Sequence, residues 1–176
     1  MPKVVNSVDL DKIALTAKEG KRDRSALRKK VALQGEWNLD QEKGYQFRAE
    51  MQYEKGNQMI EIDSPSYLGG NGNRLGPMAY CIAGMTSCFV STFATVAAID
   101  GVELTSLKVN AQCYINFAKT FDVADEPITE GLDILVKASG RNADMDRLEG
   151  LLKKAEERCP AIYSMTHVIK VNARLA

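Results

Sequence analysis

The sequence has little of what metal-binding or nucleic-acid-binding proteins depend on. It contains one histidine, His167, and four cysteines that form no C-x-x-C motif. Zinc needs a cluster of ligands, so neither a metal site nor another bound cofactor is expected. The 23 basic residues are balanced by 23 acidic ones. Without a net positive field, no nucleic-acid partner is expected.

The first residues also lack the apolar run of a secretory signal. We therefore expect a cytoplasmic protein, in which the cysteines are free or catalytic rather than joined in a disulfide framework. The 176 residues, 45% of them hydrophobic and 26% charged, are typical of a soluble globular chain. We predict an N-terminal helix with a basic linker at residues 1–30 and one main domain at residues 31–176.

One long, sparsely polar stretch dominates the chain. A glycine-rich loop at residues 68–76 precedes Pro77, which suits the first position of a helix, and Gly101 suits the position after its end. A helix that is apolar nearly all round has to be buried on all sides. The same length could span a membrane. However, Gly84 and five serine or threonine residues keep the hydrophobicity modest. We predict a buried core helix and no membrane partner.

The remaining patterns predict α+β architecture. Ser7 can cap a helix from Val8 to Glu19 that Gly20 ends, and a basic run follows, which is either an anion contact or, preferably, a solvated linker. Strands are predicted by alternation of apolar and polar residues, and a second helix by apolar residues at helical spacing. Pro160 begins a short helical turn. The predicted strands are 31–37, 45–53, 59–63, 107–117, 128–138 and 166–173, and the second helix runs from about Asp144 to Cys159. The resulting order is βββ-α-ββ-α-β with an extra N-terminal helix.

Two charged residues stand on the polar face of the second strand. Arg48 and Glu50 are two positions apart and so share one face. They form either a pair aimed at a site or part of an ordinary solvated face, where such a pair stabilises little.

Cys88 lies midway along the predicted core helix. It is roughly 16 Å from the helix start, where the dipole no longer favours a thiolate, and burial raises the pKa of a thiol. A reactive Cys88 would therefore need a cation, and Arg48 and Arg74 are the candidates. Cys81 lies about 10 Å away along the helix axis, too far for a disulfide. Cys159 is the plausible partner, and two inert buried thiols are the alternative.

Several short motifs together resemble the OsmC/Ohr family of cysteine-based hydroperoxide reductases. The resemblance extends from about Val31 to Val171. It is carried by Leu68-Gly69-Gly70, Gly76-Pro77, Ala83-Gly84-Met85-Thr86-Ser87-Cys88-Phe89 and Glu157-Arg158-Cys159-Pro160.

This resemblance implies an intertwined homodimer whose antiparallel sheets wrap the long central helices, with active sites at the subunit interface. Cys88 would be the peroxidatic cysteine, which attacks H₂O₂ or an organic hydroperoxide and becomes a sulfenic acid. Cys159 would resolve that acid to a disulfide, and an external dithiol reductant would restore both thiols. The expected role is oxidative-stress defence.

The sequence departs from the family pattern at two positions. Met78 and Ala79 stand where the family carries a glutamate, and residues 38–43 lack the arginine of the hydroperoxidases proper. Arg48 or Arg74 could replace the cation and Glu50 the carboxylate. These departures favour the OsmC-like branch. They also leave an alternative open, which is a small-molecule binding or redox-carrier protein without efficient peroxidase activity.

Overall fold

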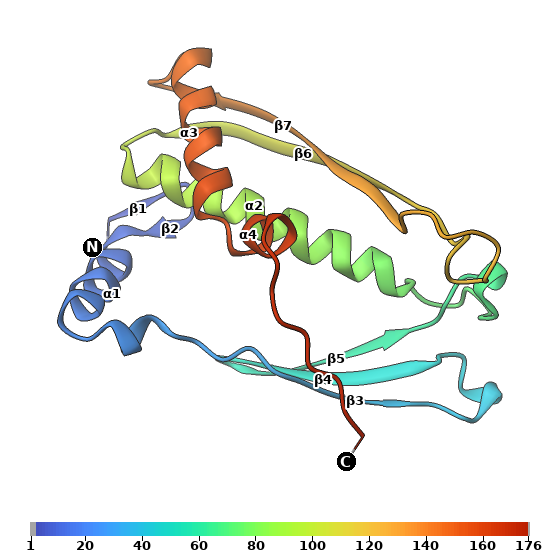
Figure 1. Ribbon diagram of the computed structural model, residues 1–176. Helices are drawn as coiled ribbons and strands as arrows, with labels where there is room; N and C mark the ends of the chain where they lie inside the picture. Colours follow the sequence, from blue (N-terminus) through green and yellow to red (C-terminus); the bar gives the residue numbers. More distant parts are fainter. Residues whose placement is uncertain (1–2, 176) are drawn as a thin grey trace. The chain divides into compact units, whose positions relative to one another are not determined.

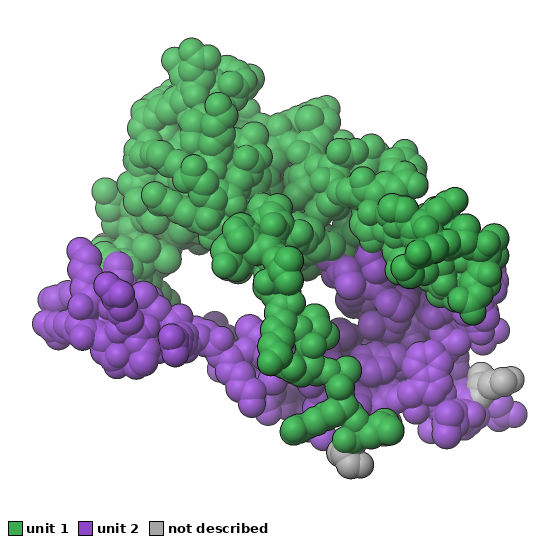
Figure 2. Space-filling view, in the orientation of Figure 1, with its two compact units in different colours: residues 1–14, 82–176 green, residues 15–81 purple. Residues whose placement is uncertain are grey.

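A computed structural model describes residues 3–175 of the chain, which divides into two compact units. Unit 1 comprises residues 1–14 and 82–176, and unit 2 comprises residues 15–81 (Figure 2). Residues 1–30 thus fall into both units, and a separate domain at residues 31–176 stays a prediction. The described helices are α1 (Leu10–Arg22), α2 (Pro77–Ile99), α3 (Met145–Arg158) and α4 (Pro160–Thr166) (Figure 1).

The N-terminal helix begins later than the sequence predicts. Val4–Val5 (β1) and Val8–Asp9 (β2) form a two-residue antiparallel hairpin. Ser7 lies in its turn with a φ of 62°, so it does not cap the helix. Instead, Asp9 Oδ1 accepts the N–H groups of Asp11 and Lys12. The predicted end at Gly20 is also wrong, because Gly20 is buried inside α1.

Helix α2 has the predicted bounds, and Gly101 follows it in the left-handed conformation with a φ of 75°. Within residues 3–175 it is the one helix long and apolar enough to cross a membrane by length and composition. Its burial differs from the prediction. The buried residues are Phe89, Phe93, Val96, Ala97 and Ala98, all in its C-terminal half. In the single chain, α2 is therefore a core helix along part of its length.

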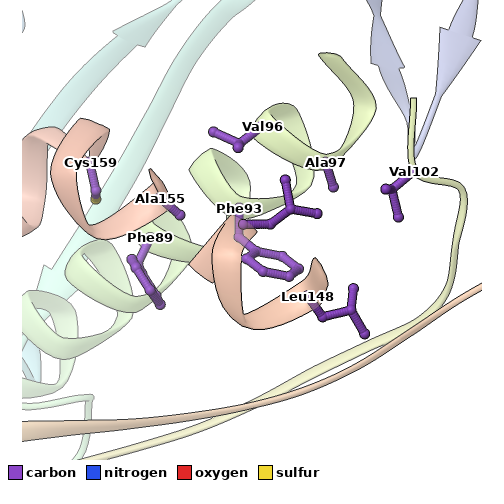
Figure 3. Close-up of a cluster of buried hydrophobic side chains, with 9 residues drawn as sticks. Phe89, Phe93, Val96, Ala97, Val102, Leu148, Ala155 and Cys159 are labelled. Carbon is purple, nitrogen blue, oxygen red and sulfur yellow. The ribbon is translucent and has the colours of Figure 1, made fainter. Parts of the chain in front are cut away.

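The core of unit 1 forms where α2, α3 and a long hairpin meet. Strands β6 (Leu104–Ile115) and β7 (Thr129–Gly140) pair antiparallel, with Val109 opposite Val136 and Cys113 opposite Leu132. Cys113 is half-buried on the apolar face, as predicted. Helix α3 starts where expected, since the Asp144 side chain accepts the Arg147 N–H. Figure 3 shows the cluster between the helices.

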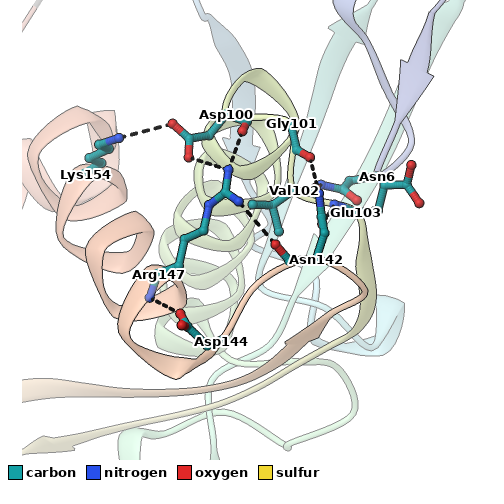
Figure 4. Close-up of polar contacts among 9 residues, drawn as sticks. All are labelled: Asn6, Asp100, Gly101, Val102, Glu103, Asn142, Asp144, Arg147 and Lys154. Carbon is teal, nitrogen blue, oxygen red and sulfur yellow. Dashed lines mark hydrogen bonds and ion pairs between the residues drawn. The ribbon is translucent and has the colours of Figure 1, made fainter.

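Polar contacts hold the C-terminal end of α2 to its neighbours in unit 1 (Figure 4). The Asp100 carboxylate pairs with Lys154 and Arg147 of α3, each at 3.3 Å. These two cations, Lys154 first, lower the pKa of Asp100. Asn6 donates to the Val102 carbonyl at 2.9 Å and accepts the Leu104 N–H at 2.8 Å. The N-terminal hairpin is thereby attached to the start of β6.

Unit 2 contains the predicted three-stranded antiparallel meander. Its strands are β3 (Leu33–Trp37), β4 (Phe47–Tyr53) and β5 (Gly56–Ile62), in the order β3-β4-β5. Ala49 is buried on the apolar face of β4. The residues after β5 form one 3₁₀ turn, Ser66–Leu68, and then the predicted glycine-rich loop.

The predicted last strand, residues 166–173, is wrong. Thr166 ends α4, and residues 167–175 have no regular secondary structure. Thr166 lies in the last turn of this helix, and its Oγ1 donates to the Ile162 carbonyl at 2.9 Å. A strand needs a neighbouring strand to satisfy its backbone groups. None pairs with this segment within residues 3–175, and Val168, Ile169 and Val171 are exposed. The observed α+β order therefore ends in two helices.

Candidate active site

Two cysteines that lie far apart in the sequence meet inside unit 1. Cys88 is on α2, and Cys159 is the residue between α3 and α4. Their sulfur atoms are 3.7 Å apart, within reach of an S–H···S hydrogen bond. Cys159 is 1% exposed, and Cys88 is half-buried. This is the juxtaposition that a redox pair requires, although the catalytic roles of the two residues stay predictions.

The position of Cys159 follows from its neighbours in the sequence. Proline at position 160 disfavours the helical conformation for the preceding residue. Cys159 is accordingly extended, with φ −77° and ψ 119°, while its N–H still donates to the Ala155 carbonyl. The chain therefore turns at Cys159. Leu151 and Ala155 pack α3 against Phe89 and Phe93 of α2, which brings the turn to Cys88.

The environment within unit 1 favours the neutral form of Cys88. Burial is the main reason that its pKa is raised, because a thiolate loses solvation there. The backbone N–H of Ala161 acts in the opposite direction, since it can donate to the sulfur. The nearby Cys159 raises the pKa further, because two thiolates side by side would repel each other. Within unit 1 the two thiols are therefore close together, but their surroundings do not favour the thiolate form of Cys88.

All four cysteines are free thiols. A disulfide between Cys88 and Cys159 would bring sulfur atoms now 3.7 Å apart to about 2.05 Å. Cys81 is exposed on α2, and Cys113 contacts the Tyr114 carbonyl.

The candidate cations lie in unit 2 and meet at a carboxylate that the sequence analysis missed. Glu61 Oε1 is 3.7 Å from Arg48 Nε, and Glu61 Oε2 is 3.3 Å from Arg74 Nε. Arg48 also lies over the Tyr45 ring at 5.6 Å. Glu50, the carboxylate suggested by the sequence, forms no ion pair with another residue among those described. Since these side chains belong to unit 2, their action on Cys88 stays a prediction.

The register of the β4–β5 hairpin could have revealed Glu61. Arg48 stands directly opposite Glu61, and opposite charges facing each other across an antiparallel pair attract.

Asp63 organises the loop that carries Arg74. This carboxylate is 1% exposed and accepts the N–H groups of Asn71 and Asn73, the second at 2.8 Å. A buried charge is tolerated when it is hydrogen-bonded in this way. The residue after Asn73 is thereby held near Glu61. No sequence motif marks Asp63, because its role depends on the path of the loop.

A pocket of about 510 Å³ with a mixed apolar and polar lining lies beside Phe89, the residue after Cys88. Leu132 and Ile134 of β7 and Leu152 of α3 contribute apolar side chains to its wall, and Glu156 and Glu157 contribute carboxylates. His167 also lines the pocket and is stacked on Tyr163 at 4.0 Å. Within residues 3–175, no group of three or more histidine, cysteine or acidic side chains is arranged to hold a metal ion.

Comparison with known proteins adds a family and a fold. Residues 70–174 match the family model described as OsmC-like protein. An OsmC-like protein from Mycoplasma pneumoniae matches with a TM-score of 0.59 at 15% identity, over 80% of this chain and 89% of that one. An organic hydroperoxide resistance protein from Legionella pneumophila matches with a TM-score of 0.57 at 20% identity, over 78% and 89%.

A third solved structure, an organic hydroperoxide resistance protein from Elizabethkingia anophelis, matches with a TM-score of 0.57 at 18% identity, over 78% of this chain and 89% of that one. At these identities the likeness shows a shared fold. Among curated proteins, no match was found.

Proposed function

Because this chain belongs to the OsmC-like family, we propose that it is a thiol peroxidase that reduces organic hydroperoxides or H₂O₂. The family and the solved neighbours described as organic hydroperoxide resistance proteins support a redox role of the peroxidase type. The observation that carries the finer proposal is the 3.7 Å separation of the Cys88 and Cys159 sulfur atoms.

In the proposed mechanism Cys88 is the nucleophile. Its thiolate attacks the terminal oxygen of the hydroperoxide, and the O–O bond breaks. Sulfur becomes a sulfenic acid, and the other oxygen leaves with a proton as alcohol or, from H₂O₂, as water. Cys159 then attacks the sulfenic sulfur, which forms the Cys88–Cys159 disulfide and releases water. An external dithiol reduces this disulfide by exchange and restores both thiols.

Activation of Cys88 requires a cation, since burial raises its pKa. We assign this role to Arg48 or Arg74, with Glu61 rather than Glu50 as the carboxylate that orients them. The assignment is supported by the two ion pairs within unit 2. A bidentate or paired guanidinium has fewer accessible rotamers than a free one, which makes it a better-positioned charge.

Three cysteine variants test the proposal. Reduced protein is mixed with cumene hydroperoxide and dithiothreitol, and peroxide consumption is followed. Cys88→Ser should abolish consumption. Cys159→Ser, mixed with cumene hydroperoxide after dithiothreitol has been removed, should consume one equivalent and leave a sulfenic acid that a dimedone probe labels. Cys113→Ser is the matched control and should keep full turnover, because Cys113 lies on the strand hairpin. Consumption that survives Cys88→Ser unchanged would refute the assignment.

A homodimer remains part of the proposal, on the strength of the family resemblance, and a cytoplasmic location remains a prediction. The exposed N-terminal half of α2 and the unpaired residues 167–175 are consistent with a second copy that covers them. Sedimentation of the purified protein measures the assembly directly, and a monomer at micromolar concentration would oppose it.

One observation favours a second candidate function. The pocket beside Phe89 is large enough for a small molecule and offers both apolar and polar side chains to it, and the surroundings of Cys88 in unit 1 raise the pKa of its thiol. A binding or redox-carrier protein would have these features. Native mass spectrometry of freshly purified protein distinguishes the two functions, because a co-purifying ligand together with inert thiols would support binding.

A further inference from the structure

Residues 18–30, here named the basic segment, concentrate positive charge in a chain whose net charge is zero. The segment contains seven basic residues and two acidic ones, a net charge of +5. It covers the end of α1, the 3₁₀ turn Arg24–Leu27 and the residues before β3, all within unit 2. Its basic residues are Lys18, Lys21, Arg22, Arg24, Arg28, Lys29 and Lys30.

The positive charge of the basic segment is not neutralised locally. All seven basic residues are exposed, and none forms an ion pair with any residue in the described part of the chain. Asp23 is occupied by Ser25, whose hydroxyl and backbone N–H both donate to its carboxylate. These hydrogen bonds lower the pKa of Asp23, with no contribution from a neighbouring cation. The segment therefore presents its full field to solvent.

Large aliphatic side chains are exposed along and beside the basic segment. Leu15 is 56% exposed, Leu27 is 51% exposed and Val31 is 85% exposed. Residues 15–33 contain no aromatic residue. Stacking on bases, which single-stranded nucleic acids use, is thus unavailable here. The phosphate backbone of a nucleic acid also offers no apolar environment in which the aliphatic side chains could be buried.

We propose that the basic segment binds the surface of anionic phospholipid bilayers. A bilayer interface accepts both features at once, since the headgroups attract lysine and arginine while aliphatic side chains enter the acyl boundary. The proposed contact is an attachment to the bilayer surface and not a membrane span. It differs from the solvated linker that the sequence pattern favoured for these residues. The proposal goes beyond the peroxidase function and does not depend on the cysteines.

Vesicle sedimentation tests the proposal with the full chain. The wild-type protein should co-sediment with phosphatidylcholine vesicles that contain about one-third phosphatidylserine, and not with pure phosphatidylcholine vesicles. The triple variant Arg28→Gln, Lys29→Gln, Lys30→Gln should weaken binding roughly 100-fold at about 0.1 M salt, because each basic residue contributes about fivefold. Val31→Ser should weaken it further, while the far-UV circular dichroism stays unchanged.

A matched control variant distinguishes the effect of the basic segment from a general effect of lost positive charge. Lys108→Gln, Lys153→Gln, Lys170→Gln removes three exposed basic residues from unit 1 and should leave binding within about twofold, since charges outside the contact are screened over a Debye length. The Cys88→Ser, Cys159→Ser variant should bind vesicles like the wild type, so loss of peroxidase activity and loss of membrane binding are distinguishable.

Two results would overturn the proposal. One is equal binding of the two triple variants. The other is salt-sensitive binding of the wild type to duplex DNA with no binding to anionic vesicles, which would assign the segment to nucleic acid instead.

Discussion

Oxidation of the Cys88–Cys159 pair should stabilise the folded protein by an amount that depends on the number of residues between the two cysteines. The two residues are 71 positions apart. Cross-linking a loop of this length removes roughly 15 cal/mol/K of entropy from the unfolded chain, which is about 4.4 kcal/mol at room temperature. Native strain subtracts from this value, so about 4 kcal/mol is the upper end.

The corresponding change in melting temperature is large enough to measure. For a chain of this size, about 1 kcal/mol shifts the midpoint by roughly 2–4 °C, so oxidation should raise it by roughly 8–16 °C. Differential scanning calorimetry of the reduced and oxidised protein measures the shift. Hydrogen exchange followed by mass spectrometry should place the added protection in α2 and α3, because the cross-linked loop lies entirely in unit 1.

The cysteine variants supply the controls for this measurement. The shift should vanish in Cys88→Ser and in Cys159→Ser, and it should persist when both Cys81 and Cys113 are changed to serine. Equal midpoints for the two redox forms, or a disulfide mapped to Cys81 or Cys113, would contradict the reasoning, since it rests on the proximity of the Cys88 and Cys159 sulfur atoms.

Three further results are expected. With Arg48 and Arg74 both changed to glutamine, the alkylation rate of Cys88 should level off at a higher pH than that of a free cysteine, because burial raises the pKa of its thiol; iodoacetamide kinetics against pH measure it. Leu151→Ala should lower the free energy of unfolding by about 2–5 kcal/mol in urea titration, since Leu151 is 1% exposed in the core of unit 1. Asn6→Ala should cost about 1–3 kcal/mol in the same assay, because the Val102 carbonyl and the Leu104 N–H lose their side-chain partner.

The sequence predicts a helix best where the residues at its ends are ones that favour those positions. Pro77 and Gly101 delimit α2, and Asp144 marks the start of α3, because caps act through bonds within a few residues. Ser7 shows how such a signal fails. It is a good capping residue, but the hairpin of Val4–Val5 and Val8–Asp9 places it in a turn, and Asp9 caps the helix.

Segments that depend on a distant partner were predicted less well. Residues 166–173 alternate like a strand, but within residues 3–175 no neighbouring strand accepts their backbone groups, and α4 takes Thr166 instead. The burial of α2 was overestimated for the same reason, since hydrophobicity shows that a helix can be buried and not what covers it.

The same distinction between local and long-range determinants applies to the candidate site. The residue types at Cys88 and at Cys159-Pro160, and the bounds of the helices that carry them, are local properties that the sequence by itself determined. Only the tertiary structure decided that the two sulfur atoms lie 3.7 Å apart and that Arg74 reaches the same carboxylate as Arg48. Contacts between residues far apart in the chain depend on how whole elements pack, and no pattern within one element carries that information.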